Sequence, residues 1–350
     1  MPLNHTVKVL IVDDSLFFRT ALQRALMQDP GIAVVGTAGT AAEAEVMIRS
    51  RSPDVVTMDV VLPDRKGTDF IRELIPKRPL PVVLVSSLDL GIFEALDAGA
   101  VDFVRKPAGL NSDYTSFYKE LIAKIKIASS ATVKKAAVRT ADLPMPALRP
   151  GAKSEHVIAI GASTGGTEAT LEILRRLPAD IPGIVIVQHM PAGFTKMYAE
   201  RLDRICSFSV SEARTGDRVE PGRAYVAPGD RHMTLFRDSR GYYVRCAEGE
   251  KVSGHCPSVD VMFRSVARTA GRDAIGVILT GMGSDGAKGL LEMRKAGAYT
   301  IGQDKDSCVV YGMPMVAYEL GAVVRQAPCS GIAGLIVRHI NGADKPSERT

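Results

Sequence analysis

Two separate stretches of this chain each show short apolar runs that alternate with helical patterns, and this alternation most constrains the fold. In the first stretch the apolar runs are 8–12, 34–36, 54–58, 82–85 and 102–104, and the clearest helical patterns are 15–27 and 41–49. Apolar runs of this length are typical of strands buried on both faces of a parallel sheet. Strand–helix alternation predicts a doubly wound α/β sheet. Residues 1–126 are therefore predicted to form one flavodoxin-like domain.

The alternation restarts after a segment of different composition. Residues 127–153 are rich in Ala, Ser, Thr, Lys, Arg and Pro, which predicts an exposed linker. Beyond it, apolar runs at 157–160, 184–187, 274–279 and 299–301 alternate with helical patterns at 167–176, 195–204, 259–270 and 285–296. The runs 224–227 and 241–244 are expected to be strands of a β-rich insertion, and 299–301 the final strand. A chain of 350 residues accommodates a second, mostly parallel α/β domain, predicted at 154–350.

Composition argues against several classes of protein. The chain has no Trp and only 5% aromatic residues, so it lacks base-stacking platforms. Its net charge of +5 is not gathered on a helix, since the densest basic cluster (Lys134, Lys135 and Arg139) lies in the predicted linker. The sequence has no signal-peptide pattern and no membrane-length apolar stretch, which predicts a cytoplasmic protein without membrane insertion or nucleic-acid binding. Five cysteines without a CxxC pair predict free thiols.

Acidic residues follow two strands of the first predicted domain. Asp13 and Asp14 come directly after the first strand, and Asp59 follows the third. The carboxyl ends of parallel strands meet at one edge of a sheet, where ligands bind. Three carboxylates gathered there would repel one another unless a hard cation such as Mg²⁺ lay among them. Taken singly, Asp13 or Asp14 could instead cap a helix beginning near Ser15.

A hydroxyl and an ammonium group are expected at the same edge, because Ser86 ends the fourth strand and Lys106 follows the fifth. With the acidic residues, this pattern makes residues 7–126 resemble a two-component receiver domain. The resemblance implies a histidine kinase as phosphodonor. It also implies one role for each residue: phosphoacceptor for Asp59, magnesium ligands for Asp13, Asp14 and Asp59, switch hydroxyl for Ser86, and phosphate-binding cation for Lys106.

The chain departs from the receiver pattern at two places. Lys66 stands directly before Gly67, where the family usually has an acidic residue. The segment between Ser86 and Gly99 is about one helical turn shorter than the family leads us to expect. The fourth helix, often part of the signalling face in this family, is therefore predicted to be truncated.

A serine occupies the turn that follows the first strand of the second predicted domain. Residues 161–166 fit GxSxG, with Ser163 at the nucleophile position. A dinucleotide-binding turn would need Gly where Ser163 stands. His189 follows the next strand, and Asp285 follows the run 274–279. All three lie past the carboxyl ends of predicted parallel strands, so they can meet as nucleophile, base and orienting acid. Their order, Ser–His–Asp, differs from the Ser–Asp–His order of α/β-hydrolases.

Five motifs surround these residues. They are GASTGGT at 161–167, HMPAGFT at 189–195, APGDRHM at 227–233, HCPSVD at 255–260 and LTGMGSDG at 279–286. In this order they resemble the catalytic domain of the chemotaxis protein-glutamate methylesterase family. The resemblance implies hydrolysis of glutamyl methyl esters on chemoreceptor helices by Ser163, His189 and Asp285, with no metal in that step, and the family often also deamidates receptor glutamines. Backbone N–H groups near Thr164 and Met282 are candidate oxyanion donors. His232 and His255 lie in the motifs without an assigned role.

The sequence fits two other classes of function less well. A receiver joined to a DNA-binding output would need a basic recognition helix, which the second half lacks. A nucleotide-dependent oxidoreductase would need an acidic residue at the end of the second strand of its domain, where this chain has Gln188 and His189.

Overall fold

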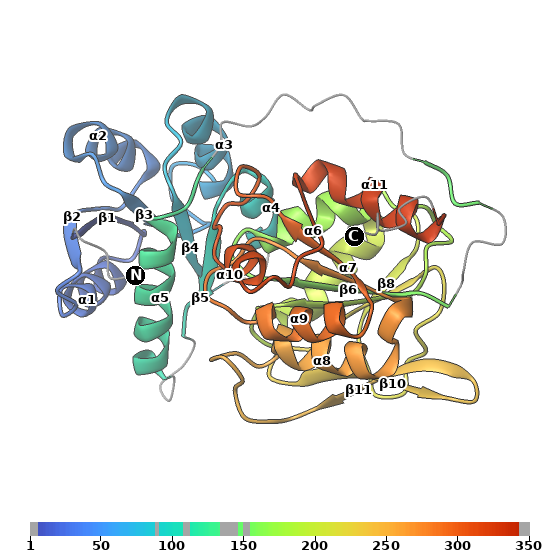
Figure 1. Ribbon diagram of the computed structural model, residues 1–350. Coiled ribbons are helices and arrows are strands. Elements are labelled where there is room, and N and C mark those ends of the chain that lie inside the picture. Colours follow the sequence, from blue (N-terminus) through green and yellow to red (C-terminus); the bar gives the residue numbers. More distant parts are fainter. Residues whose placement is uncertain (1–5, 88–90, 108–112, 134–145, 150–154, 343–350) are drawn as a thin grey trace. The chain divides into compact units, whose positions relative to one another are not determined.

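The computed structural model describes residues 6–87, 91–107, 113–133, 146–149 and 155–342. Its internal contacts divide the chain into two units, Met1–Thr140 and Ala141–Thr350. Each unit is built on a parallel β-sheet with helices on both faces (Figure 1), so the predicted α/β fold class is confirmed.

The first unit contains a five-stranded parallel sheet in the order β2–β1–β3–β4–β5. Its strands are β1 (Val7–Val12), β2 (Ile32–Ala38), β3 (Val55–Met58), β4 (Val82–Ser86) and β5 (Asp102–Arg105). Helices α1 (Leu16–Leu26) and α5 (Tyr114–Ala128) cover one face, and α2 (Ala41–Arg51), α3 (Gly67–Lys77) and α4 (Ile92–Asp97) cover the other. Strand β2 lies on one side of β1, and β3, the next strand in the chain, lies on the other side, so the strand order reverses at β1. The ends of β1 and β3 are therefore the place where a sheet of this kind binds ligands.

Two predictions about this unit bear on its boundaries. Helix α4 has six residues, whereas the other four helices have eleven to fifteen, so the fourth helix is short as expected. Helix α5 ends at Ala128, just beyond the boundary predicted at residue 126.

The second unit contains a seven-stranded sheet in which every paired neighbour is parallel, in the order β14–β13–β12–β6–β7–β9–β8. The strands are β6 (Val157–Ala162), β7 (Ile184–Gln188), β8 (Ser209–Glu212), β9 (Arg223–Val226), β12 (Ala274–Ile278), β13 (Tyr299–Gln303) and β14 (Arg325–Ala327). Strands β6, β7 and β12 are buried along their whole length. Because β6 lies between β7 and β12, the strand order reverses at β6, and a sheet of this kind binds ligands at the end of that strand.

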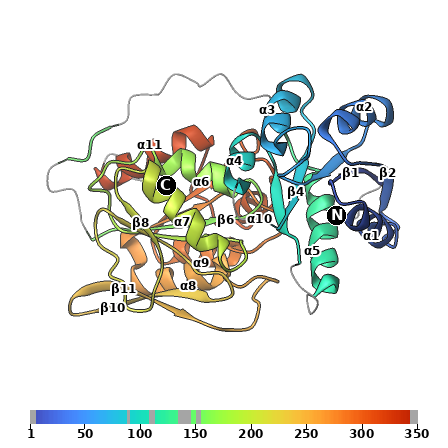
Figure 2. The same cartoon turned by 180° about the vertical axis from the view of Figure 1, so that it is seen from behind.

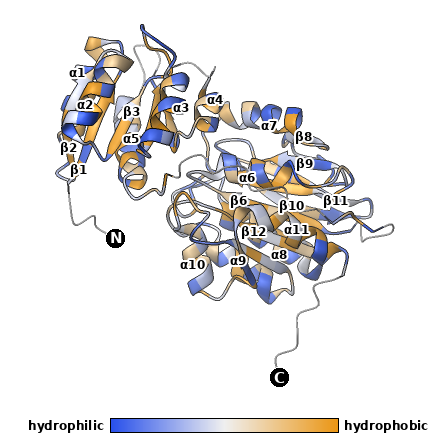
Figure 3. Ribbon diagram, turned by 90° about the horizontal axis from the view of Figure 1, so that it is seen from above, coloured by the Kyte–Doolittle hydropathy of each residue, from blue (hydrophilic) through white to orange (hydrophobic). Residues whose placement is uncertain are grey.

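Helices cover both faces of the second sheet. Helices α6 (Gly166–Leu174), α7 (Phe194–Ile205) and α11 (Cys329–Ile340) lie on one face, and α8 (Val259–Thr269) and α9 (Ala287–Lys295) on the other (Figures 1 and 2). Helix α10 (Met313–Glu319) packs against α9, and a hairpin of β10 (His232–Asp238) and β11 (Gly241–Ala247) packs on α8. Hydrophilic and hydrophobic residues alternate along helices such as α7 (Figure 3), as expected where one helix face meets the sheet and the other meets water.

Two sequence predictions for this unit need correction. Strand β9 is not part of a β-rich insertion, because it pairs in parallel with β7 and β8 inside the main sheet; only β10 and β11 form a separate hairpin. The final strand is β14 rather than 299–301. Two of the three residues of β14 are exposed, so this edge strand leaves no apolar run in the sequence.

The predicted linker is partly attached to the second unit. The Arg149 backbone N–H donates to Asn341 Oδ1 at 2.9 Å, and Asn341 Nδ2 donates to the Ala147 carbonyl at 3.0 Å. Residues 134–145 and 150–153 of the linker lie outside the described residues.

All five cysteines are free, which confirms that prediction. Among the described residues, every helix is too short or too polar to cross a membrane.

Candidate functional site

Three neighbouring strands of the second sheet deliver Ser163, His189 and Asp285 to one edge. Ser163 follows β6 directly, and its backbone N–H donates to the Thr280 carbonyl at 3.0 Å, beyond the end of β12. His189 follows β7, and its N–H donates to the Ala162 carbonyl at 3.1 Å. The turn that carries Ser163 is therefore bonded to the strand ends on both sides.

His189 and Asp285 form a buried pair. Their Nε2 and Oδ2 atoms lie 2.8 Å apart, and their side chains are 7% and 1% exposed. A carboxylate only accepts hydrogen bonds, so Nε2 carries the proton of the neutral imidazole and Nδ1 keeps a free lone pair. Within the described residues this Nδ1 atom is buried and has no partner. Ser163 is half-buried on the neighbouring turn, and no hydrogen bond joins its hydroxyl to this Nδ1 atom.

The carboxylate of Asp285 is held at the N-terminus of α8. Ser258 Oγ donates to Oδ1 at 2.8 Å, the Val259 N–H to Oδ2 at 2.8 Å, and the Asp260 N–H to Oδ1 at 3.0 Å. Ser258 is also the N-cap of this helix. Burial alone would raise the pKa of Asp285, but the hydrogen bond with His189, together with the α8 donors, holds it below its usual value. Asp285 is thus kept ionised.

Two further histidines surround this pair. The His255 ring stacks on His189, with centroids 3.7 Å apart and planes 7° from parallel. His232 Nδ1 accepts from the Ser258 N–H at 3.2 Å, and Nε2 lies 2.8 Å from the Glu250 carbonyl. Because an N–H can only donate and a carbonyl can only accept, His232 is a neutral ring that binds backbone. The structure therefore places His255 against the His189 ring and gives His232 contacts with backbone.

Sequence reasoning missed Gln188 and the α8 donors. Gln188 Nε2 donates to the Ser163 carbonyl at 2.8 Å and lies 3.4 Å from the His189 carbonyl, so it ties the two turns together. The signal that could have found it is a polar residue ending a buried apolar strand. For Ser258, the signal was an N-cap residue directly before an apolar helical pattern.

The loop after β12 approaches Ser163 closely at Gly281. A Cβ atom on Gly281 would lie 2.6 Å from Ser163 Cβ and 2.5 Å from Met313 Sδ, so only glycine fits. Met282 comes next; its side chain is exposed, and its N–H has no hydrogen-bond partner among the described residues. Thr164 is buried beside Ser163, and its carbonyl accepts from Thr280 Oγ1 at 3.0 Å. Of the two candidate oxyanion donors, Thr164 thus follows Ser163 in the chain, and Met282 follows the glycine that packs against Ser163.

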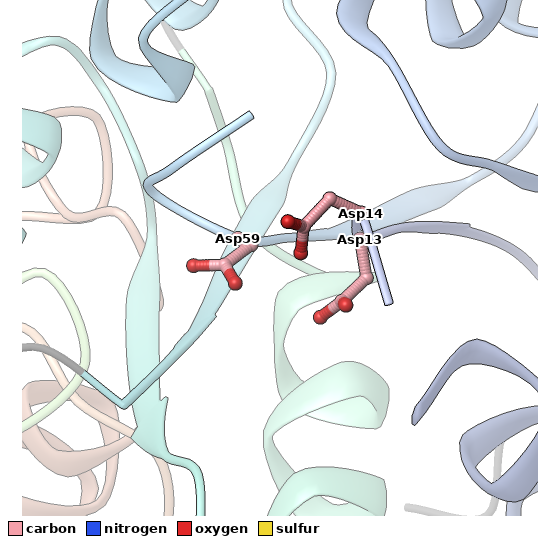
Figure 4. A group of neighbouring side chains, drawn as sticks. All are labelled: Asp13, Asp14 and Asp59. Carbon is pink, nitrogen blue, oxygen red and sulfur yellow. The ribbon is translucent and has the colours of Figure 1, made fainter. Parts of the chain in front are cut away.

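The first unit brings Asp13, Asp14 and Asp59 together. One carboxylate oxygen of each lies within 4.8 Å of the others (Figure 4). Asp13 and Asp59 are buried, whereas Asp14 is exposed. Three oxygen ligands with one side open to solvent match the preference of Mg²⁺ for carboxylates and retained waters. These residues therefore fit a magnesium ion.

Lys106 lies between the two buried carboxylates. Its Nζ atom is 2.5 Å from Asp13 Oδ2 and also binds Asp59. Burial alone would lower the pKa of Lys106, but the two carboxylates hold it above its usual value. Burial raises the pKa of Asp13 although Lys106 opposes this. Ser86 is buried at the same edge, where its carbonyl accepts from the Lys106 N–H at 2.9 Å.

Comparison with known proteins relates both units to known families. The model of the response regulator receiver domain matches residues 9–112, and that of the CheB methylesterase matches residues 158–336. A protein-glutamate methylesterase/protein-glutamine glutaminase from Syntrophomonas wolfei is 54% identical over 336 residues, which cover 96% of this chain and 98% of that protein. One from Syntrophotalea carbinolica is 50% identical and covers 95% and 97%.

A solved structure extends the comparison to the second unit. The catalytic domain of the CheB methylesterase of Thermotoga maritima is 38% identical, with a TM-score of 0.52. The match covers 53% of this chain and 100% of that domain.

Proposed function

The chain belongs to the protein-glutamate methylesterase family of hydrolases, and we propose that it removes methyl groups from glutamyl γ-esters on chemoreceptor helices by a Ser–His–Asp mechanism. The observation that carries this proposal is the 2.8 Å bond between His189 and Asp285 beside the Ser163 turn. Because relatives are also named glutaminases, we extend the proposal to the side-chain amides of receptor glutamines.

Acylation begins when Ser163 Oγ attacks the ester carbonyl carbon. His189 Nδ1 takes the hydroxyl proton, and the ionised Asp285 stabilises the imidazolium that forms. The carbonyl oxygen becomes an oxyanion, for which the backbone N–H groups of Met282 and Thr164 are the proposed donors. When the tetrahedral intermediate collapses, the imidazolium returns its proton to the leaving methoxide. Methanol departs, and a glutamyl ester of Ser163 remains.

Deacylation repeats the same proton transfers with water as the nucleophile. His189 accepts a proton from water, the hydroxide adds to the acyl carbon, and the proton then passes to Ser163 Oγ. Glutamate and free enzyme result. A glutamine substrate would form the same acyl-enzyme with ammonia as the leaving group.

The first unit is proposed to receive a phosphoryl group on Asp59 from the histidine kinase of a chemosensory array. Asp13, Asp14 and Asp59 would hold Mg²⁺, which when bound neutralises charge on the phosphoryl oxygens. Lys106 already contacts Asp59 and would pair with a phosphoryl oxygen there. The Ser86 hydroxyl, at the end of the neighbouring strand, would contact another.

Phosphorylation is proposed to control the esterase. The proposed division is a receiver at 1–126, a linker at 127–153 and a catalytic domain at 154–350, in a cytoplasmic protein. In this scheme the unphosphorylated receiver restrains the serine site, and phosphorylation at Asp59 relieves that restraint.

Methanol release from methylated receptors tests both proposals in one assay. We expect acetyl phosphate with Mg²⁺ to accelerate the wild-type chain and to leave Asp59→Asn at its basal rate. Ser163→Ala should release no methanol with or without the phosphodonor. Activity that survives in Ser163→Ala would reject the nucleophile, and equal stimulation of Asp59→Asn would reject the phosphoacceptor.

A further inference from the structure

A second buried aspartate lies beside the catalytic carboxylate. Asp260, in the first turn of α8, is 1% exposed. Its backbone N–H donates to Asp285 Oδ1 at 3.0 Å, while its own Oδ1 accepts from the Gly289 N–H in α9 at 2.7 Å. Asp285 stands directly before Gly286, the N-cap of α9. The first turn of α8 thus binds the carboxylate of Asp285, which directly precedes the N-cap of α9. The first turn of α9 binds the carboxylate of Asp260, which lies in α8.

This exchange closes a loop of contacts around Asp285. The start of α8 holds Asp285, the chain runs from Asp285 into α9, and the first turn of α9 returns to α8 through Gly289 and Asp260. Moving the start of α9 would move Asp285 with it, since only Gly286 separates this residue from the helix. The bond between Gly289 and Asp260 opposes such a movement.

The close approach of α8 and α9 depends on the absence of a side chain at Gly289. A Cβ atom there would lie 2.7 Å from Phe263 Cβ and 2.9 Å from the Asp260 carbonyl oxygen. Such contacts would force the helices apart. The residue that donates to Asp260 is therefore also the residue that lets the two helices come close enough for this bond.

A purely structural role would be served at lower cost by a neutral residue. The Asp260 side chain is buried near the Asp285 carboxylate, and the cation paired with it among the described residues is Arg264, whose Nη2 lies 3.8 Å from Oδ2. Burial, and to a smaller extent the charge of Asp285, raise the pKa of Asp260. A carboxyl group in this place costs stability, which is the usual mark of a group retained for a task.

We propose that Asp260 is a positioning residue for hydrolysis, which fixes the first turn of α9 through Gly289 and thereby sets Asp285 against His189. This inference rests on the proposed roles of Ser163, His189 and Asp285. A small misplacement of a catalytic group costs about 100-fold in rate. Asp260→Ala should therefore lower kcat by roughly 100-fold and leave KM within about threefold. Asp260→Asn keeps an oxygen that accepts from Gly289 and should recover at least about tenfold of that loss.

The test measures methanol release by the full-length chain at several receptor concentrations. Asp203→Ala is the matched control, because Asp203 Oδ1 also accepts a backbone N–H, that of Val210 at 2.7 Å, at the end of α7. We expect kcat of this variant to match the wild type. If Asp260→Ala does not fold, Asp260→Glu replaces it. Its carboxylate is shifted by one methylene, so Asn should then exceed Glu in kcat.

A double variant separates positioning from general support of the fold. If Asp260 acts through Asp285, adding Asp260→Ala to Asp285→Asn should lower kcat by less than about threefold further. Three results would each overturn the inference. The first is a double variant whose loss in kcat is the product of the two single losses. The others are an Asn variant with kcat no higher than Ala or Glu, and wild-type kcat in Asp260→Ala. Ser163→Ala run alongside distinguishes the two levels: activity in that variant rejects the mechanism itself, whereas its inactivity leaves the Asp260 result to stand alone.

Discussion

The two units place buried aspartates at equivalent points of two parallel sheets but supply them with different partners. Asp59 and Asp13 share one charged partner, the Lys106 ammonium at the end of a flexible side chain. Asp285 has four donors, namely His189, the Ser258 hydroxyl and two backbone N–H groups at the start of α8. Both sites lie where the strand order reverses. The same topology therefore supports two kinds of carboxylate site.

The type of hydrogen-bond partner determines whether a carboxylate is held fixed or can change its contacts. Backbone donors on a helix cannot leave, so Asp285 is held ionised and stationary, as the proposed mechanism requires of its orienting acid. A lysine side chain can exchange one oxygen for another, so the Asp13–Asp59 site can admit a cation or a phosphoryl group and rearrange. One site is preorganised and the other is exchangeable.

The preorganised site should fail most severely. Asp285→Asn removes the charge that stabilises the His189 imidazolium and alters the proton on Nε2, so we expect kcat to fall by roughly 10⁴-fold. Methanol release under saturating receptor measures this. Asp203→Asn, a carboxylate on the same unit away from the serine, is the control. A loss below about tenfold would show that Asp285 does not support the base.

Removing the exchangeable cation should abolish control but not catalysis. Lys106→Met leaves Asp13 and Asp59 without their shared ammonium, and we expect stimulation by acetyl phosphate to disappear while basal methanol release stays within about twofold. The midpoint of thermal unfolding should gain more from Mg²⁺ in this variant than in the wild type, because an ion would then supply the missing positive charge. Undiminished stimulation would contradict the role given to Lys106.

The same Asp→Asn substitution should have opposite effects on stability at the two sites. The pKa of Asp13 is raised above its ordinary value of 3.8, so its stabilising contribution is present below about pH 4 and is lost as pH rises through the folded pKa. At pH 7 Asp13→Asn should therefore raise the midpoint of receiver unfolding by about 3 °C. The gain should shrink toward pH 4.

Asp285 has the reverse sign. Its pKa is lowered, so its contribution is present above the ordinary value of 3.8 and is lost as pH falls through the folded pKa. Asp285→Asn should lower the unfolding midpoint at pH 7. Calorimetry of both variants across pH checks the pair, and shifts of equal sign would remove the distinction between the two sites.

The smallest effect is expected at the stacked histidine. His255 covers the face of the His189 ring, so His255→Ala should lower kcat by only about three- to tenfold through a less ordered base. His255→Phe keeps a flat ring and should restore most of this. If Phe is as poor as Ala, a chemical role of the imidazole replaces the stacking account.

Most of the fold could be predicted from the sequence, because buried parallel strands leave continuous apolar runs. The same runs predicted which residues follow strand ends and lie close together, although their roles remain proposals. Strand β6, buried throughout, was readable, and so were the residues that follow strand ends. Strand β14 was missed because an exposed edge strand lacks such a run. The placement of β9 was wrong, since apolar residues reveal a strand but not its neighbours.

The contacts around Asp285 could not be read from the sequence for a different reason. Ser258 and Asp260 lie about 25 positions away along the chain, and their bonds to Asp285 depend on how α8 and α9 pack. Neither periodicity nor motif spacing specifies that packing. The motif at 255–260 marked the segment, but only the structure gave its residues their contacts.

Interception of the acyl-enzyme by hydroxylamine tests the central claim most directly. A glutamyl ester on Ser163 would react with hydroxylamine as well as with water, so the wild-type chain should yield glutamyl hydroxamate on the receptor together with methanol. Ser163→Ala, which corrects for direct attack on the ester, should yield no more hydroxamate than a sample without enzyme. Methanol release by the wild type with hydroxamate only at that background level would contradict a covalent Ser163 intermediate.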